Sequence, residues 1–236
     1  MSALRVAVVG DGKMGRAVAD LARERAWTVT AVLGIKDNEH GAALTRERLG
    51  DTDVVIEFTE PSAAPTNILA AAHAGYPVVT GTTGWADELE RVTKAVLDLQ
   101  GALVHAPNFS VGVNLFLALV AAAGRVMRRA PQFDAHIVET HHAAKKDAPS
   151  GTAIALERAA SSELARPIPI TSVRTGHVPG THDLSFDGPF EQIRLTHTAR
   201  DRRVFADGAL HAAEWVRGRR GVFTMRDVLD LGSEAV

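Results

Sequence analysis

The sequence reads RVAVVGDGKMG over residues 5–15, an apolar run rich in valine that ends in a glycine-rich turn. From Lys13 to Arg25 the apolar residues recur at helical spacing, with Met14, Val18 and Leu21 on one face. The stretch therefore predicts a buried strand, a tight turn and a helix. This is how a βαβ unit begins, and it favours a parallel sheet.

The turn places glycines at positions 10, 12 and 15, the GxGxxG spacing of a dinucleotide-binding turn. The first glycine permits the sharp turn, the second lets the backbone approach a pyrophosphate, and the third packs the helix against the strand. The start of the helix offers N–H groups and a positive dipole end to phosphates. We therefore expect cofactor contacts from Gly10, Asp11, Gly12, Lys13 and Met14.

The identity of the dinucleotide depends on the tip of the next predicted strand, residues 28–33. An acid that would bond the ribose of NAD is not present there. Lys13 and Lys36 are close enough in sequence to meet a 2′-phosphate, so we expect NADPH to be accepted, with NADH also possible. Asp37 or Glu39 could still bond a ribose hydroxyl.

Strands and helices go on alternating through the first hundred residues. Strands are predicted at 53–58, 77–80 and 103–105, and helices at 63–74 and 85–99. Such alternation implies a parallel, doubly wound sheet, whose ligands bind at the carboxyl ends of the strands. The loops there offer further cofactor contacts from Gly81, Thr82, Thr83, Ala106, Pro107, Asn108 and Phe109, with Phe109 able to pack on a nicotinamide. Ordinary turns would have the same composition, so the loops alone do not decide between the two.

The pattern changes after residue 108. Helices are predicted at 111–128, 151–164, 208–216 and 225–231, with strands at 133–139, 171–173, 181–186 and 192–199. The last three strands look antiparallel because glycine and proline turns separate them. The predicted fold class is α/β: a Rossmann-like dinucleotide-binding domain plus a second α+β substrate-binding domain with a mostly antiparallel or mixed sheet.

Composition limits the remaining possibilities. The 236 residues are 46% hydrophobic and 23% charged with a formal net charge of −2, so we expect neither nucleic acid nor a membrane as partner. The absence of cysteine excludes disulfides, thiol catalysis and cysteine-based zinc sites. The longest apolar run, Leu115–Ala123, is too short to span a bilayer, and no signal peptide is apparent, so we expect a cytoplasmic protein.

A second informative run, ETHHAAKKDAPSGT, covers residues 139–152. His141 can titrate near neutrality, and Lys145 can donate a proton or hold a carboxylate. Pro149 and Ser150 precede a predicted helix whose first N–H groups suit an anion. The run follows a predicted strand, so we expect it to form a loop. Taken alone, these residues fit a polar surface loop with a helix cap better than a catalytic site. We expect no metal site, because no cysteine and no HExxH spacing occur.

The segment from His141 to Ala153 resembles the HHxxKxDAPSGTA signature of the dihydrodipicolinate reductase family. Segments at 78–84, 108–114 and 223–229 are also similar to family segments and occur in family order. The resemblance covers essentially the whole chain. It implies an NAD(P)H-dependent reduction of 4-hydroxy-tetrahydrodipicolinate in the lysine and diaminopimelate pathway.

The resemblance also implies residue roles. His141 matches the family's proton donor and acceptor, and Lys145 its second proton donor. His142, Gly151 and Thr152 match residues that bind the substrate, a small cyclic dicarboxylate. The family further implies a homotetramer built through the second domain, and a C-terminal segment that returns to the first. We therefore expect a dinucleotide-binding domain at 1–107 and 204–236, and a substrate-binding and oligomerisation domain at 108–203.

Two departures from the family pattern affect the adenosine end of the cofactor. The first turn is one residue shorter and carries Lys13, and the segment 34–53 is compressed. Two other functions stay open. A related Rossmann amino-acid dehydrogenase should lack the paired histidines before Lys145. A non-catalytic dinucleotide sensor would keep the three glycines but would not need His141 or Lys145.

Overall fold

A computed structural model describes residues 3–232 of the chain. Its contacts divide the chain into two compact units. Unit 1 holds the chain up to Val111 together with Arg203–Asp230, and unit 2 holds Gly112–Arg202 together with the residues from Leu231. Residues 1–2 and 233–236, which belong to the first predicted domain, lie outside the described residues.

Unit 1 contains the parallel sheet that the glycine-rich turn predicted. Its six strands lie in the order β10-β5-β4-β3-β1-β2, and every neighbouring pair is parallel. The strands are β1 (Arg5–Val9), β2 (Thr28–Leu33), β3 (Val54–Glu57), β4 (Val78–Thr80), β5 (Ala102–His105) and β10 (Gly221–Phe223). The order reverses at β1, because β2 and β3 lie on opposite sides of it, and open sheets bind ligands at such a point.

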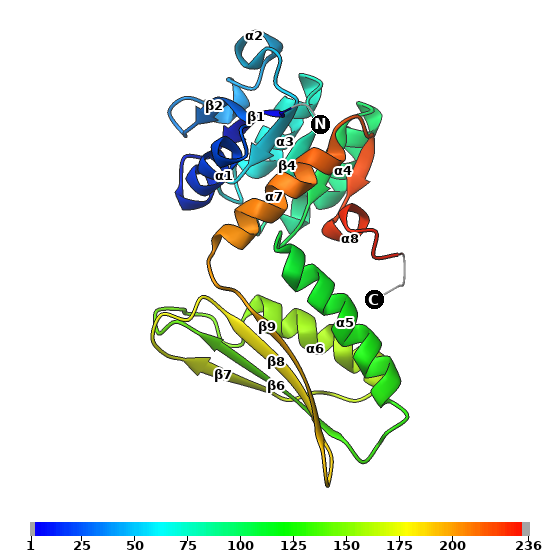
Figure 1. Cartoon of the computed structure of the whole chain (residues 1–236). Helices are drawn as coiled ribbons and strands as arrows, with labels where there is room; N and C mark the ends of the chain where they lie inside the picture. The colour runs from blue at the N-terminus through cyan, green and yellow to red at the C-terminus, as the bar shows by residue number, and fades with distance from the viewer. Residues whose placement is uncertain (1–2, 233–236) are drawn as a thin grey trace. The chain divides into compact units, whose positions relative to one another are not determined.

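Helices cover both faces of this sheet (Figure 1). They are α1 (Lys13–Glu24), α2 (Arg46–Leu49), α3 (Ala64–His73), α4 (Leu89–Asp98), α7 (Arg203–Val216) and α8 (Met225–Val228). Successive residues of β1 enter different cores: Val6 and Val8 pack with α1 and α7, whereas Ala7 and Val9 pack with α3 and α4. Burial on both faces explains why the strand is a continuous apolar run.

The C-terminal part of unit 1 differs from the prediction. Helix α7 begins at Arg203, five residues before the predicted start at Gly208, and strand β10 was not predicted. Gly208 does not mark a helix start. A Cβ at this position would lie 1.7 Å from the Phe109 carbonyl oxygen, so the glycine lets α7 pack closely on that backbone.

Unit 2 is a four-stranded sheet with two helices on one face (Figure 1). The strands are β6 (Asp134–His141), β7 (Ile170–Arg174), β8 (Thr181–Asp187) and β9 (Gln192–Thr198), in the order β7-β6-β8-β9. Helix α5 (Val111–Met127) begins at the last residue of the first segment of unit 1, and α6 (Gly151–Leu164) follows the histidine run. The core joins Ile137, Leu184 and Phe186 of the sheet to Leu156 of α6.

Two predictions for unit 2 were wrong in ways that matter for the site. Strand β7 is parallel to β6, not antiparallel, because α6 connects them as a crossover. Strand β6 also continues to His141, two residues beyond the predicted end and into the run expected to form a loop. It does so because His141 pairs with Arg174, and Thr140 pairs with both Val173 and Thr181.

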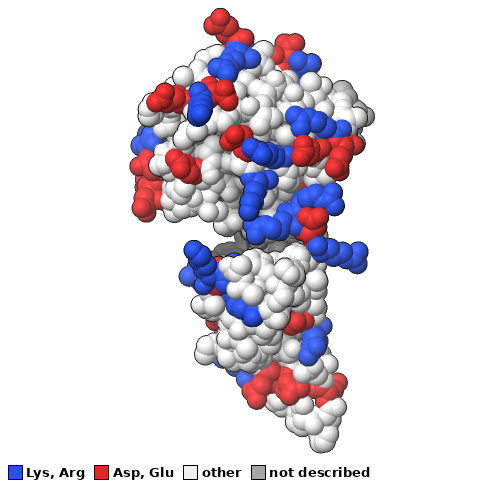
Figure 2. All heavy atoms as spheres, turned by 90° about the vertical axis from the view of Figure 1, so that its left-hand side faces the viewer, with Lys and Arg blue, Asp and Glu red and all other residues white. Residues whose placement is uncertain are grey.

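The charged side chains do not form a surface of one sign on the face shown in Figure 2. Lysines and arginines are interspersed there with aspartates and glutamates. Within residues 3–232, no helix combines the length and apolarity needed to cross a membrane.

Candidate active site

The glycine-rich turn is shaped by two close backbone approaches. Gly10 has φ +106°, and a Cβ there would lie 2.0 Å from the Phe58 carbonyl oxygen. A Cβ at Gly15 would lie 1.8 Å from the Gly10 carbonyl oxygen. Both positions therefore require glycine, the first because the chain turns under the loop after β3 and the second because α1 packs directly on the turn.

Gly12 has a different environment, which fits a dinucleotide. It is the N-cap residue of α1, no side chain caps the helix, and its first turn carries no acidic residue. A Cβ at Gly12 would meet no atom within 4 Å, so space lies open in front of the positive end of the helix. Lys13 and Met14 form the first turn of α1. An anionic pyrophosphate is suited to this position.

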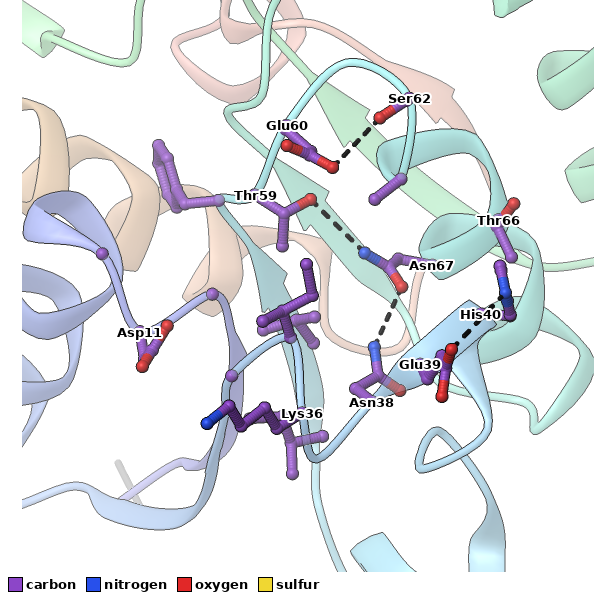
Figure 3. Close-up of a pocket in the computed structure, with 18 residues that line it drawn as sticks. Asp11, Lys36, Asn38, Glu39, His40, Thr59, Glu60, Ser62, Thr66 and Asn67 are labelled. Carbon is purple, nitrogen blue, oxygen red and sulfur yellow. Dashed lines mark hydrogen bonds and ion pairs between the residues drawn. The ribbon is translucent and has the colours of Figure 1, made fainter.

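A cavity of about 730 Å³ adjoins this turn at the carboxyl ends of β1, β2 and β3 (Figure 3). Asp11 and Lys36 lie beside the turn, and Asn38 and Asn67, joined by a hydrogen bond of 2.9 Å, lie farther from Asp11. Lys13 is not among the described residues that line the cavity. Its side chain therefore has a weaker claim than Lys36 to a 2′-phosphate.

A carboxylate lies close to the tip of β2, although β2 itself carries none there. Asp11 extends over Gly34, where a Cβ would lie 3.0 Å from the Asp11 carboxyl carbon. Asp11 of the glycine-rich turn is therefore a candidate acid at this end of the cavity. Of the two other candidate acids, Asp37 accepts a hydrogen bond of 3.3 Å from the Gly34 N–H, and Glu39 lines the cavity.

Glu57, at the end of β3, fixes the loops that follow β3 and β4. Its carboxylate is fully buried and accepts hydrogen bonds from the Thr59 N–H at 3.0 Å and from the Thr80 and Thr82 hydroxyls at 2.5 and 3.0 Å. The Thr59 N–H also donates to the Thr82 hydroxyl at 2.8 Å. Thr82, a predicted cofactor residue, is thereby held beside the carboxyl end of the sheet, next to Gly81 and Thr83.

The loop after β5 departs from one expectation. Phe109 is only 2% exposed, and its ring packs edge-on against Phe58 with centroids 6.2 Å apart. The ring therefore belongs to the core and does not offer a face to a nicotinamide. Pro107 remains exposed, Ala106 is buried, and Asn108 accepts a hydrogen bond of 2.9 Å from the Ser110 N–H.

In unit 2, strand register gathers polar groups at one end of the buried sheet face. Glu139 and His141 are two residues apart and so point to the same face as the core residue Ile137. In the sheet, His182 of β8 is opposite Glu139, and Arg174 of β7 is beside His141. Four polar side chains from three strands therefore meet where the apolar core ends.

Glu139 is the centre of this group. Its side chain is fully buried, and its Oε1 accepts hydrogen bonds from Arg174 at 2.6 Å and from the Ser150 N–H at 3.3 Å. Its Oε2 is hydrogen-bonded to His141 Nδ1. Burial alone would raise the pKa of Glu139, but hydrogen bonds from Arg174, Ser172 and His141 outweigh it and lower the pKa to about 2. The carboxylate is therefore ionised at neutral pH.

The two buried histidines lie edge to face, with ring centroids 5.2 Å apart. Burial lowers the pKa of His141, although the hydrogen bond and charge of Glu139 oppose this. Burial, together with the nearby charge of His141, lowers the pKa of His182 to about 4. His182 is thus neutral at pH 7, and its Nε2 lies 3.3 Å from the Ser150 hydroxyl.

Ser150 joins this group to the start of α6. Its hydroxyl is the N-cap and accepts from the Ala153 N–H at 3.2 Å. Gly151 and Thr152 follow it in the first turn, and a Cβ at Gly151 would meet no atom within 4 Å. The helix N-terminus thus presents open space beside the histidines, as an anionic ligand requires. His142 follows β6 directly and is held by a 2.8 Å hydrogen bond from its N–H to the Val178 carbonyl.

The two lysines of the run have different surroundings. Lys145 is partly buried, and its ammonium group lies 2.7 and 2.9 Å from the two carboxylate oxygens of Asp147. Lys146 is exposed. This difference supports Lys145 over Lys146 as a candidate for chemistry, in agreement with the family resemblance, which matches Lys145.

Glu139, His141 and His182 also lie close enough together to hold a metal ion, because one potential ligand atom of each lies within 4.8 Å of the others. Their hydrogen bonds argue for a different use. Both carboxylate oxygens of Glu139 already accept bonds, one of them from the Arg174 guanidinium. A cation at this position would lie beside that positive charge, so we interpret the cluster as an ionic hydrogen-bond network.

Sequence reasoning assigned no role to Glu139, Arg174 or His182. One signal was available for Glu139: it alternates with Ile137 and His141 on what the pattern predicts to be the buried face of a strand. A charged residue on such a face needs a partner. The partners themselves are distant in sequence, 35 residues away for Arg174, so no local pattern could identify them.

Comparison with protein families gives matches over nearly the whole chain. The model described as dihydrodipicolinate reductase, N-terminus, matches residues 4–109. The model described as dihydrodipicolinate reductase, C-terminus, matches residues 112–229.

Curated relatives agree with this result, and a solved structure shares the fold. A 4-hydroxy-tetrahydrodipicolinate reductase from Christiangramia forsetii is 34% identical over 96% of this chain and 98% of its own. Another from Rhodopseudomonas palustris is 37% identical over 99% of each. A dipicolinate-bound dihydrodipicolinate reductase from Paenisporosarcina has a similar fold, with a TM-score of 0.80, 23% identity and coverage of 94% and 98%.

Proposed function

Because the chain belongs to the dihydrodipicolinate reductase family, we propose that it catalyses the NAD(P)H-dependent reduction of 4-hydroxy-tetrahydrodipicolinate to tetrahydrodipicolinate, with loss of water. This is a step of lysine and diaminopimelate biosynthesis. The observation that carries the proposal is the match of both halves of the chain, residues 4–109 and 112–229, to the two parts of this one family. The paired histidines and Lys145 argue against a sensor that performs no chemistry.

The proposed cofactor site lies in unit 1. The open N-terminus of α1 at Gly12 supports a pyrophosphate position there, and the adjoining cavity supports an adenosine position beside Asp11 and Lys36. When bound, the reduced nicotinamide supplies the hydride. The chain's contribution is to orient and hold the cofactor. The residues we assign to it are Gly10, Asp11, Gly12, Lys13, Met14, Lys36, Gly81, Thr82, Thr83, Ala106, Pro107 and Asn108, together with the main chain of Phe109, whose ring is buried.

The proposed substrate residues lie in unit 2. Gly151 and Thr152 hold one carboxylate of the ring at the positive end of α6, and His142 provides a further contact. In domain terms, residues 1–107 and 204–236 bind the dinucleotide, and residues 108–203 bind the substrate and other copies of the chain.

Proton transfer falls to His141 and Lys145. Loss of water from the substrate leaves a conjugated imine, and reduction at carbon four of the ring leaves an enamine. His141 then donates a proton to the enamine carbon, where a C–H bond forms as the N–H bond breaks. Lys145 is the second proton donor. Its ammonium group also places positive charge near the substrate carboxylates.

A direct assay tests the function. Purified protein should oxidise NAD(P)H, followed by its absorbance, only when 4-hydroxy-tetrahydrodipicolinate is generated in the same cuvette. Slow oxidation that is independent of this substrate would favour a sensor. Turnover with an amino acid or a keto acid in its place would favour a related dehydrogenase.

The same assay tests the cofactor preference. We expect turnover with both NADPH and NADH, with NADPH used at least as well, because Lys36 lines the cavity and can pair with a 2′-phosphate. Lys36→Ala should then raise the KM for NADPH and leave that for NADH little changed. Lys146→Ala, an exposed lysine of the other unit, is the matched control. A strong NADH preference in the unmodified protein would remove the role of Lys36.

For assembly and location we propose a cytoplasmic homotetramer. Strand β9 is at the edge of its sheet, and Ile193 on it is 44% exposed, which supports burial of this edge by further copies. Sedimentation equilibrium should give four times the chain mass, and the mass of a single chain would contradict the assembly. Cell fractionation would test the location.

A further inference from the structure

Glu139 has no part in the chemistry proposed above, yet it contacts the proton donor directly. Its carboxylate is fully buried at the end of the core and is hydrogen-bonded to His141 Nδ1. Burying a charge is costly unless it is paired, and here the partner that neutralises it is Arg174, 2.6 Å away. A carboxylate held in this way next to a catalytic histidine calls for a function.

The hydrogen bonds assign each oxygen of Glu139 a separate task. Oε1 accepts from the Arg174 guanidinium and from the Ser150 N–H, two groups that can only donate. The Ser172 hydroxyl also donates a hydrogen bond to this carboxylate. Oε2 is the oxygen bonded to His141, and an ionised carboxylate can only accept. The shared proton must therefore come from the histidine, so Nδ1 carries it.

We propose that Glu139 is the positioning residue that keeps His141 in the Nδ1–H tautomer, so that Nε2 is the atom that exchanges a proton with the substrate. This inference rests on the proposed function for the identity of the substrate. Gly180 supports it from the other side of the ring. A Cβ at this position would lie 3.0 Å from Nε2, so the glycine adds no side chain against that nitrogen.

The proton balance is consistent with this arrangement. Protonated His141 carries hydrogens on both ring nitrogens. The Nε2–H bond breaks as a C–H bond forms at the enamine carbon, and the electrons of the N–H bond stay on Nε2. The product is neutral His141 with its hydrogen on Nδ1, still bonded to Glu139, which itself gains no proton. The hydrogen bond between His141 Nδ1–H and Glu139 is thus already in place before the proton is transferred from Nε2.

Glu139 also affects the pKa of His141, because it is one of several charged groups around the ring. The titratable and charged groups that face the ring are Glu139 on β6, Lys145 in the following loop, Arg174 on β7 and His182 on β8. Of these, Glu139 favours the protonated ring, whereas Lys145 and Arg174 disfavour it. Loss of the negative charge should therefore make His141 a proton donor only at lower pH.

The substitution Glu139→Gln tests the tautomer of His141 directly, because Oε1 and Oε2 of Glu139 bond different groups. Arg174 and the Ser150 N–H require an acceptor, so the glutamine must place its oxygen at their position. Its NH₂ group then donates a hydrogen bond to His141 Nδ1, so that Nδ1 can no longer carry a hydrogen. The substitution keeps the shape of the side chain, yet it should force the opposite tautomer, with the hydrogen on Nε2.

The experiment combines nitrogen-15 NMR of the histidine rings with pH profiles of kcat. In the unmodified protein we expect neutral His141 to carry its hydrogen on Nδ1, a measurement that needs no variant. In Glu139→Gln we expect the hydrogen on Nε2. We also expect the high-pH limb of kcat to shift down by about one pH unit or more, with the substrate KM little changed.

Asp183→Asn provides the matched control. Asp183 follows His182 in β8, so its carboxylate points to the opposite sheet face, where the Thr196 hydroxyl donates to it. This variant should leave both the tautomer and the pH limb unchanged. Finding Nε2–H in the unmodified protein, or an unaltered tautomer and limb in folded Glu139→Gln, would overturn the inference. The NMR result is independent of turnover, so failure of the proposed function would be recognised separately by the assay.

Discussion

Replacing His141 with alanine is expected to lower kcat by about 10²-fold or more, the range for loss of a general acid. His141 is the last residue of β6, and its ring is fixed between Glu139 and the neighbouring ring of His182. No water held in its place would have the same orientation or a comparable pKa. Steady-state kinetics with the coupled substrate would measure the change.

The same strand offers a control for this substitution. His136 also lies on β6, on the opposite face from His141, and is hydrogen-bonded to the Thr171 hydroxyl at 2.9 Å. His136→Ala should retain most of the activity. Binding of NADPH by His141→Ala should also be unaffected, because the proposed cofactor site lies in unit 1 and His141 in unit 2. Near-native turnover by the variant would refute the role of His141.

Replacing Lys145 with alanine is the second large effect we expect, again about 10²-fold or more in kcat. The ammonium group of Lys145 is partly buried and is held by both oxygens of Asp147. Its removal would take away the proposed proton donor and a positive charge at once. Kinetics of kcat and KM, measured separately, would show which loss dominates, since loss of the charge alone should raise mainly the KM.

Two variants separate these contributions. Lys146→Ala removes the exposed neighbouring lysine and should leave kcat almost unchanged. Lys145→Arg keeps the charge, but arginine stays protonated and cannot act as an acid. We therefore expect Lys145→Arg to bind substrate and to remain slow. Full recovery of kcat in that variant would show that Lys145 acts by charge and not as a proton donor.

The first half of the fold was predictable because its signals are local. The valine run of β1, the glycines at 10 and 15 and the helical spacing after Lys13 all act within a dozen residues. The confirmed parallel sheet follows from repeating that unit. The edge strand β10, by contrast, comes from three residues near the C-terminus that pair with β5, far away in sequence, and no local pattern distinguishes it.

One strand of unit 2 and one side chain of unit 1 show where local reasoning fails. The strand at 171–173 was expected to be antiparallel, but its direction depends on α6 crossing over from β6, which is a property of the whole βαβ unit. The ring of Phe109 was expected to meet a ligand, but tertiary packing against Phe58 places it in the core. Hydrophobicity predicts that an aromatic side chain is buried, but not what it is buried against.

The sequence alone determined the order of the elements, the dinucleotide turn and the run that carries His141, Lys145 and the start of α6. It also carried the family resemblance that the comparisons confirmed. Only the tertiary structure showed that Glu139 joins His141 to Arg174 of β7 and to the helix cap at Ser150. The reason is physical: side chains alternate along a strand, but which of them meet is set by the register between strands that are distant in sequence.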